Sequence, residues 1–110
     1  GGASNTTRGI NFGGRASAGA SSNVIDYVTV ASTGDASDFG DLSVALDNQA
    51  SGTSSVSNLT KAEVYGGNTT GGDGMQDNID YVTIASTGNA TSAGDDMTAA
   101  KASGAAFSGT

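Results

Sequence analysis

Apolar residues in this chain are concentrated in short runs that alternate along the backbone. The strongest run is Asn23 to Ala31 (NVIDYVTVA), in which Ile25 and Tyr27 point to one side while Val28 and Val30 point to the other. β-Branched and aromatic residues in such a run are typical of a strand. Because both faces are apolar, we expect this strand to be covered on both sides by neighbouring sheets.

Shorter runs predict further strands on either side of the strongest one. Each contains a few apolar residues and is bounded by Gly, Ser, Thr, Asn or Asp, which favour turns. The expected elements of the first half are a strand at Arg8 to Gly14, a turn at Ser32 to Asp35, an edge-like strand at Ser37 to Val44, and a polar strand or loop at Gln49 to Ser57.

The chain repeats itself. Ile25 to Ala36 reads IDYVTVASTGDA and Ile79 to Ala90 reads IDYVTIASTGNA, identical at ten of twelve positions with an offset of 54 residues. No apolar period of 3.6 residues competes with the strand pattern, so the chain is predicted to be all-β with two four-stranded units, residues 1–57 and 58–110. The expected strands of the second unit are Lys61 to Gly67, Asn78 to Ala85, Thr91 to Thr98 and Ala102 to Thr110.

The expected register leaves one strand without a partner. If each unit has four strands, the chain begins at a second strand (Arg8) and ends with a first strand (Ala102 to Thr110). We therefore expect the last strand to pair with the start of another copy or with an adjacent repeat of a longer chain. Such a contact is heterologous, so it would close into a ring or continue as a filament.

Composition supports a dependence on neighbours. The chain has 18 glycines in 110 residues and no cysteine, so its core is thin and no disulfide contributes to stability. Its net charge is −7, and its four cations do not cluster, which argues against nucleic acid and anionic membranes as partners. No apolar run approaches the length of a membrane span, so no membrane insertion is expected. The four cations are Arg8, Arg15, Lys61 and Lys101.

The repeated residues resemble the kelch repeat. An aromatic residue precedes a glycine pair in each unit, a strand of the form IDYVT follows, and Phe39 stands near the fourth strand, although the usual Trp of the family is absent. The amino-acid sequence of the repeat is also similar to tandem repeats in structural and fibre proteins of marine bacteriophages. The resemblance implies that each unit is a blade of a β-propeller, closed or extended by other copies. The signature residues are Gly13, Gly14, Ile25, Asp26, Tyr27, Gly66, Gly67, Ile79, Asp80 and Tyr81.

Catalytic and metal chemistry find little support in the residue types. Histidine and cysteine are absent, which removes the commonest general base and the thiol nucleophile. Asp26 and Asp80 could form a carboxylate pair, but residues at the same register of a repeat are more often structural. We expect no enzyme and no cofactor. The acidic residues Asp35, Asp38, Asp41, Asp95 and Asp96 could hold Ca²⁺, yet their spacing fits no EF-hand loop and solvated turns explain them better.

Polar loops are the expected places for ligand contacts, since recognition usually resides on loops held by a rigid sheet. The sequence therefore predicts a non-enzymatic structural and attachment module of a virion fibre or extracellular appendage, which assembles through blade packing and could also contact host-surface glycans. The alternative is a stand-alone carbohydrate-binding lectin that oligomerises into one propeller. The candidate loop residues are Arg15, Asn68, Thr69, Thr70, Asp73, Gln76 and Asp77.

Overall fold

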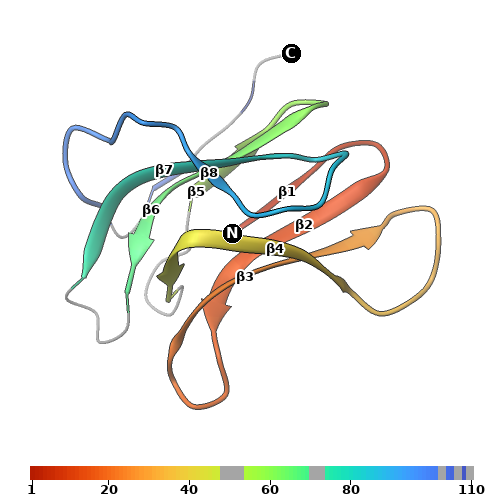
Figure 1. Ribbon diagram of the computed structural model, residues 1–110, viewed down its shortest axis with the longest axis horizontal. Coiled ribbons are helices and arrows are strands. Elements are labelled where there is room, and N and C mark those ends of the chain that lie inside the picture. Colours follow the sequence, from red (N-terminus) through yellow and green to blue (C-terminus); the bar gives the residue numbers. More distant parts are fainter. Residues whose placement is uncertain (48–53, 70–73, 102–103, 106–107, 109–110) are drawn as a thin grey trace.

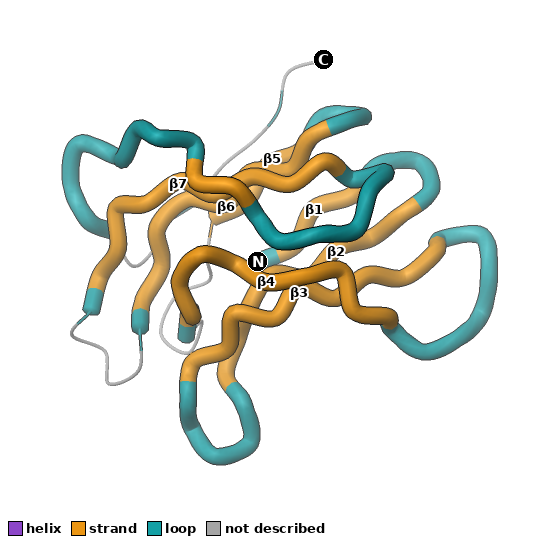
Figure 2. The backbone as a smooth tube through the Cα atoms, viewed as in Figure 1, coloured by secondary structure: helices purple, strands orange, loops and turns teal. Residues whose placement is uncertain are grey.

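The protein consists of two antiparallel sheets of four strands each. The computed structural model describes residues 1–47, 54–69, 74–101, 104–105 and 108, and these residues contain no helix. The all-β prediction is confirmed, and Figures 1 and 2 show the two sheets side by side. The first sheet, in the order β1-β2-β3-β4, contains β1 (Gly2–Ser4), β2 (Arg8–Arg15), β3 (Ser21–Thr29) and β4 (Ser37–Leu46). The second, in the order β5-β6-β7-β8, contains β5 (Ser54–Ser57), β6 (Lys61–Asn68), β7 (Met75–Thr83) and β8 (Thr91–Ser92).

The first strand of the first sheet lies earlier than predicted. The expectation that the chain begins at a second strand is wrong, because β1 precedes β2 and pairs with it, with Ala3 opposite Ile10. The sequence Gly-Ala-Ser is too short and too small to give a strand signal. Strand β5, placed at the end of the first unit by the pattern, pairs with β6, so sheet membership changes between Leu46 and Ser54.

The turn before each second strand is built in the same way in both sheets. The Oδ1 atom of Asn5 accepts hydrogen bonds from the backbone N–H groups of Thr7 and Arg8, both at 2.8 Å. Asn58 does the same with Thr60 at 2.8 Å and Lys61 at 2.7 Å. An Asn side chain that bonds to the backbone two residues on favours a tight turn. The repeat thus extends beyond the segment in which the residues are identical.

The glycine pairs interrupt the strands at equivalent points. Gly13 and Gly66 have φ values of 56° and 52°, a region that residues with a Cβ seldom occupy. The pairing of β2 with β3 shifts between Phe12 and Gly14, and that of β6 with β7 shifts between Tyr65 and Gly67. The pairs therefore form β-bulges, which bend the strands.

The last strand of the second sheet is much shorter than its counterpart. The predicted strand from Thr91 to Thr98 is observed only as β8, whereas β4 extends over ten residues. In β4, Phe39 is buried in the core, while Ala93 takes its place after β8 and is exposed. Without a large apolar side chain, the segment after Ser92 gains too little from burial to remain a regular strand.

The core lies between the two sheets. It forms one cluster with contributions from both, in which Phe12 and Ile25 of the first sheet and Val64 and Ile84 of the second are almost completely buried. Within the described residues of this chain, β3 is covered on one side only: Val28 is 43% exposed, because none of these residues forms a layer over the face of β3 opposite Ile25. Cover on both sides therefore stays a prediction about neighbouring copies.

The predicted terminal strand, Ala102 to Thr110, falls largely outside the described residues. Residues 102–103, 106–107 and 109–110 are not described, and Gly104, Ala105 and Ser108 are not in a strand.

Candidate functional site

The most elaborate contact in the molecule is the one between the sheets. Asp80 of β7 is fully buried and accepts hydrogen bonds from the backbone N–H of Ser43 at 2.8 Å and from its hydroxyl at 2.7 Å. Ser43 belongs to β4, so this carboxylate joins the two sheets. Hydrogen bonds to an ionised group are about twice as strong as neutral ones, which offsets the cost of burying Asp80.

A cation marks the same position in each sheet. The guanidinium of Arg8 lies 4.6 Å from the ring centroid of Tyr27, and its Nη1 donates a hydrogen bond of 2.7 Å to the carbonyl of Ile84 in the other sheet. In the second sheet, the ammonium of Lys61 lies 3.9 Å from the centroid of Tyr81. The cation over the tyrosine is therefore a repeated feature, and among the described residues only Arg8 also reaches a neighbouring sheet.

Small residues bring the backbones of the two sheets close together. The hydroxyl of Ser57 donates to the carbonyl of Ser4 at 2.8 Å and accepts from its N–H at 3.2 Å. At the other side of the contact, a Cβ atom on Gly40 would lie 2.3 Å from the carbonyl oxygen of Gly88. Asn89 Oδ1 accepts the backbone N–H of Asp41 at 3.0 Å.

The two sheets contact each other through unlike faces. In the first sheet, the core residues Ile10, Phe12 and Ile25 project from one face of β2 and β3. In the second sheet, the buried residues Val64 and Val82 project from the opposite face of the equivalent strands β6 and β7. The face that one sheet buries in the contact is therefore the counterpart of the face that the other sheet leaves open. The contact between the sheets is therefore heterologous, because two different faces meet.

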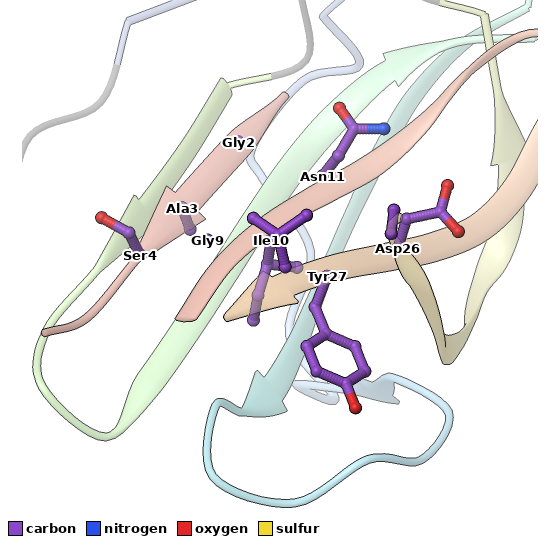
Figure 3. Close-up of a pocket in the computed structure, with 10 residues that line it drawn as sticks. Gly2, Ala3, Ser4, Gly9, Ile10, Asn11, Asp26 and Tyr27 are labelled. Atoms are coloured by element: carbon purple, nitrogen blue, oxygen red, sulfur yellow. The ribbon is translucent and has the colours of Figure 1, made fainter. Parts of the chain in front are cut away.

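The open side of the first sheet is apolar. We call it the first outer face, and it consists of Asn11, Val24, Asp26, Val28 and Val30. The valines are 39%, 43% and 62% exposed respectively. A shallow hollow of about 380 Å³ lies over β1, β2 and β3 and is lined by residues that include Asn11, Asp26 and Val28. Figure 3 shows Asp26 and Tyr27 pointing to opposite sides of β3.

The open side of the second sheet is more polar. We call it the second outer face, and it consists of Glu63, Tyr65, Ile79 and Met97, all half-buried. The hydroxyl of Tyr65 donates a 2.5 Å hydrogen bond to Glu63 Oε2. Burial, together with this hydrogen bond and the charge of Glu63, raises the pKa of Tyr65 to about 12.

The signature residues divide between structural and exposed roles. The glycine pairs form the bulges, and Tyr27 and Tyr81 support the cations. Asp26 and Asp80 occupy equivalent positions, yet Asp80 is buried between the sheets and Asp26 lies on the first outer face. Ile25 is fully buried, whereas its counterpart Ile79 is only half-buried.

The structure gathers some of the predicted loop residues. Asn68, Thr69 and Gln76 lie together at the β6–β7 hairpin, where Gln76 Nε2 donates to the carbonyl of Gly74 at 3.0 Å. Asn68 is 6% exposed, and its buried Oδ1 has no hydrogen-bond partner among the described residues. Asp77 is exposed on β7. Arg15 is exposed at the end of β2, in the other sheet, while Thr70 and Asp73 lie outside the described residues.

The acidic residues do not assemble into a metal site in the described part of the chain. No group of three or more carboxylates there could hold an ion. Asp35 and Asp38 are exposed on and beside the loop before β4. The less favoured interpretation of these acids, a Ca²⁺ site, is therefore not supported by the arrangement of the described residues.

No protein-family model matches the chain, and no curated protein matches it. Within the described residues there is no helix that could span a membrane.

Sequence reasoning missed the residues that distinguish the two outer faces. The exposure of Val24, Val28 and Val30 was not predicted, because apolar residues on both faces of a strand favour cover on both sides. Ser43, which binds Asp80 between the sheets, was not predicted either. The signal that could have found Val28 and Val30 is the repeat itself, since their counterparts are the apolar residues Val82 and Ile84.

Proposed function

We propose that this protein is a non-enzymatic structural module that assembles by stacking its sheets, as part of a virion fibre or extracellular appendage. The observation that supports the proposal is the directional contact between the sheets, which uses unlike faces and leaves one of each kind open. A surface built in this way is suited to repetition, because every added sheet again presents an open face.

Attachment to a host-surface glycan is a second part of the proposal. Two equivalent small hollows, of about 160 and 180 Å³, lie beside the loops after β3 and β7. Each is lined by a Ser, a Thr and a carboxylate or amide, as in Ser32, Thr33 and Asp35 of the first sheet. Hydroxyl, amide and carboxylate groups are the ones that bind sugar hydroxyls. The same feature favours the second candidate, a stand-alone lectin.

Particle shape tests the proposal. Sedimentation velocity and negative-stain electron microscopy over a range of protein concentrations should show particles larger than one chain. Open filaments favour the appendage, and a small closed ring favours the lectin. A protein that stays monomeric at every concentration and binds no glycan on an array would contradict both candidates.

The glycan part has its own experiment. Asp35→Ala removes a carboxylate from the first hollow, and Asp38→Ala is the matched control, because Asp38 is an exposed carboxylate that does not line that hollow. Binding of a glycan should weaken about tenfold for the first variant and remain unchanged for the second. Equal binding by both variants would exclude the first hollow as the site.

A further inference from the structure

We propose that the first outer face binds the second outer face of another copy of this chain, in the same orientation as the internal contact between the sheets. The inference rests on the proposed assembling function and names the surfaces that carry it. The partner is thus a second copy, and its contact is heterologous.

Part of the first outer face is the counterpart of a buried surface, although the polar Asn11 stands where Val64 is buried. At an offset of 54 residues, Val28 corresponds to Val82, which is 4% exposed, and Val30 corresponds to Ile84, which is fully buried. The positions that are buried in and directly after β7 are open to solvent in and directly after β3. Covering them with a sheet would remove apolar area from water, as it does inside the chain.

Asp26, the charged residue of the first outer face, also has a candidate hydrogen-bond donor beside the second outer face of another copy. The close neighbours of Gly13 include Leu42, and those of Gly66 include Met97, so Met97 is the structural counterpart of Leu42. The next residue, Thr98, therefore corresponds to Ser43. In the proposed contact, the exposed hydroxyl of Thr98 donates to Asp26 of the other copy, as Ser43 donates to Asp80.

Glycines that would allow a close backbone approach are present on both surfaces of the proposed contact. Inside the chain, Gly40 lies against Gly88, and a Cβ on Gly40 would collide with it. Their counterparts are Gly94 and Gly34, and each has no heavy atom within 4 Å of the place where a Cβ would stand. These two open glycines would meet in the proposed contact.

Lys61, the cation of the second sheet, corresponds to Arg8 of the first sheet and could make the equivalent contact with another copy. Arg8 crosses from the ring of Tyr27 to the carbonyl of Ile84. Lys61 already lies over the ring of Tyr81, and the carbonyl that corresponds to that of Ile84 is the one of Val30, in the other copy. The ammonium of Lys61 is exposed and also lies 3.9 Å from Glu63 Oε1, and a change of its terminal rotamer would bring it to this carbonyl.

The structure disfavours the symmetric alternative, in which two first outer faces meet. Each face carries Asp26 without a cation of its own, because the guanidinium of Arg8 is engaged with Tyr27 and Ile84. Two carboxylates would then be taken out of water in one contact, which is costly.

The proposed contact is weaker than the internal one. Glu63 stands where Ile10 is buried in the first sheet, and Ala93 stands where Phe39 is buried. The second outer face therefore offers less apolar area. We expect reversible, concentration-dependent association, and Ala93→Phe should strengthen it.

Two variants with complementary defects test the proposal. Val28→Glu damages only the first outer face and Ile79→Glu damages only the second, while Leu59→Glu is the control, since Leu59 is 68% exposed and lies on neither face. Sedimentation velocity should show that each of the first two variants self-associates about 100-fold more weakly than the wild type, and that the control does not. An equimolar mixture of the two should form a 1:1 heterodimer, because one intact contact remains between them.

Several outcomes would overturn the inference. If wild type associates but Ile79→Glu still dimerises alone, the first outer faces pair symmetrically. If wild type associates and the mixture stays monomeric, the contact lies elsewhere; in both cases the assembling function survives. A wild type that never associates removes the assembling function as well. Far-UV circular dichroism confirms that each variant is folded, and Met97→Glu replaces Ile79→Glu if that variant unfolds.

Discussion

Asp26 and Asp80 show how strongly the surroundings of a residue decide its role. They occupy the same place in the same sequence motif, next to a tyrosine that supports a cation. Only Asp80 has a neighbouring sheet, and with it the hydrogen bonds from Ser43. The motif predicts the position of a carboxylate but not whether it is buried.

Replacing the buried carboxylate should destabilise the fold. Asp80→Ala removes the acceptor for the N–H and hydroxyl of Ser43, and we expect the free energy of unfolding to fall by about 1–3 kcal/mol. Asp38→Ala, at an exposed position of β4, should change it by less than about 0.5 kcal/mol. Urea unfolding followed by circular dichroism measures both values. Equal effects would show that the buried hydrogen bonds contribute little.

Tyr65 makes stability depend on pH in the alkaline range. Its pKa is about 12 in the folded protein, chiefly because of burial, against an ordinary value of 10.0. The folded state therefore holds the proton more tightly, so this contribution is complete below pH 10 and is lost as the pH rises towards about 12. Tyr65→Phe should remove that part of the alkaline decline in unfolding free energy.

The partner of Tyr65 provides the control for this prediction. Glu63→Gln removes the negative charge beside the hydroxyl and leaves the burial of the ring unchanged, so the folded-state pKa of Tyr65 should fall. The decline in unfolding free energy should then be smaller and end at a lower pH than in the wild type. An alkaline unfolding curve that is the same in all three proteins would mean that Tyr65 titrates normally.

Among the elements, β4 and β8 illustrate the limits of the repeat. Sequence reasoning correctly placed strands at Arg8 to Gly14, Asn23 to Ala31 and Lys61 to Gly67, because β-branched and aromatic residues alternate there. It overestimated the strand after Thr91. A repeat predicts where a strand lies, whereas the length of the strand depends on an anchor such as Phe39.

The close approach of β4 to the loop after β7 can be tested with two glycines. Gly40 and Gly34 have similar φ values, 149° and 154°, so alanine is strained at both. Only at Gly40 would the new Cβ collide with the backbone of Gly88. Gly34→Ala should cost about 1–3 kcal/mol of unfolding free energy, and Gly40→Ala distinctly more. Equal costs would indicate that the sheets separate there at little expense.

At the scale of the whole molecule, each sheet depends on the other. The core is a single cluster between them, so a separated first sheet would expose Phe12, Ile25 and Phe39 together. The fragment 1–47 should therefore show no cooperative thermal unfolding and no protected amide groups in hydrogen exchange. The full chain is the reference, and a fragment that unfolds cooperatively would show that one sheet is stable alone.

The sequence by itself determined the repeat, the all-β class and the positions of most strands. These properties follow from local rules, namely the alternation of side chains along a strand and the turn preferences of Gly and Asn. The glycine pairs were predicted only as the ends of their strands, whereas they form bulges within β2 and β6, where a positive φ strongly favours glycine.

Only the tertiary structure decided which face of each sheet is covered. Two nearly identical segments, IDYVTVA and IDYVTIA, expose Val30 in one case and bury Ile84 in the other. Burial depends on which neighbour lies against a residue, and in the described part of this chain one face of each sheet has no neighbouring sheet against it. That is why the valines of β3 could not be recognised from their own sequence as a surface.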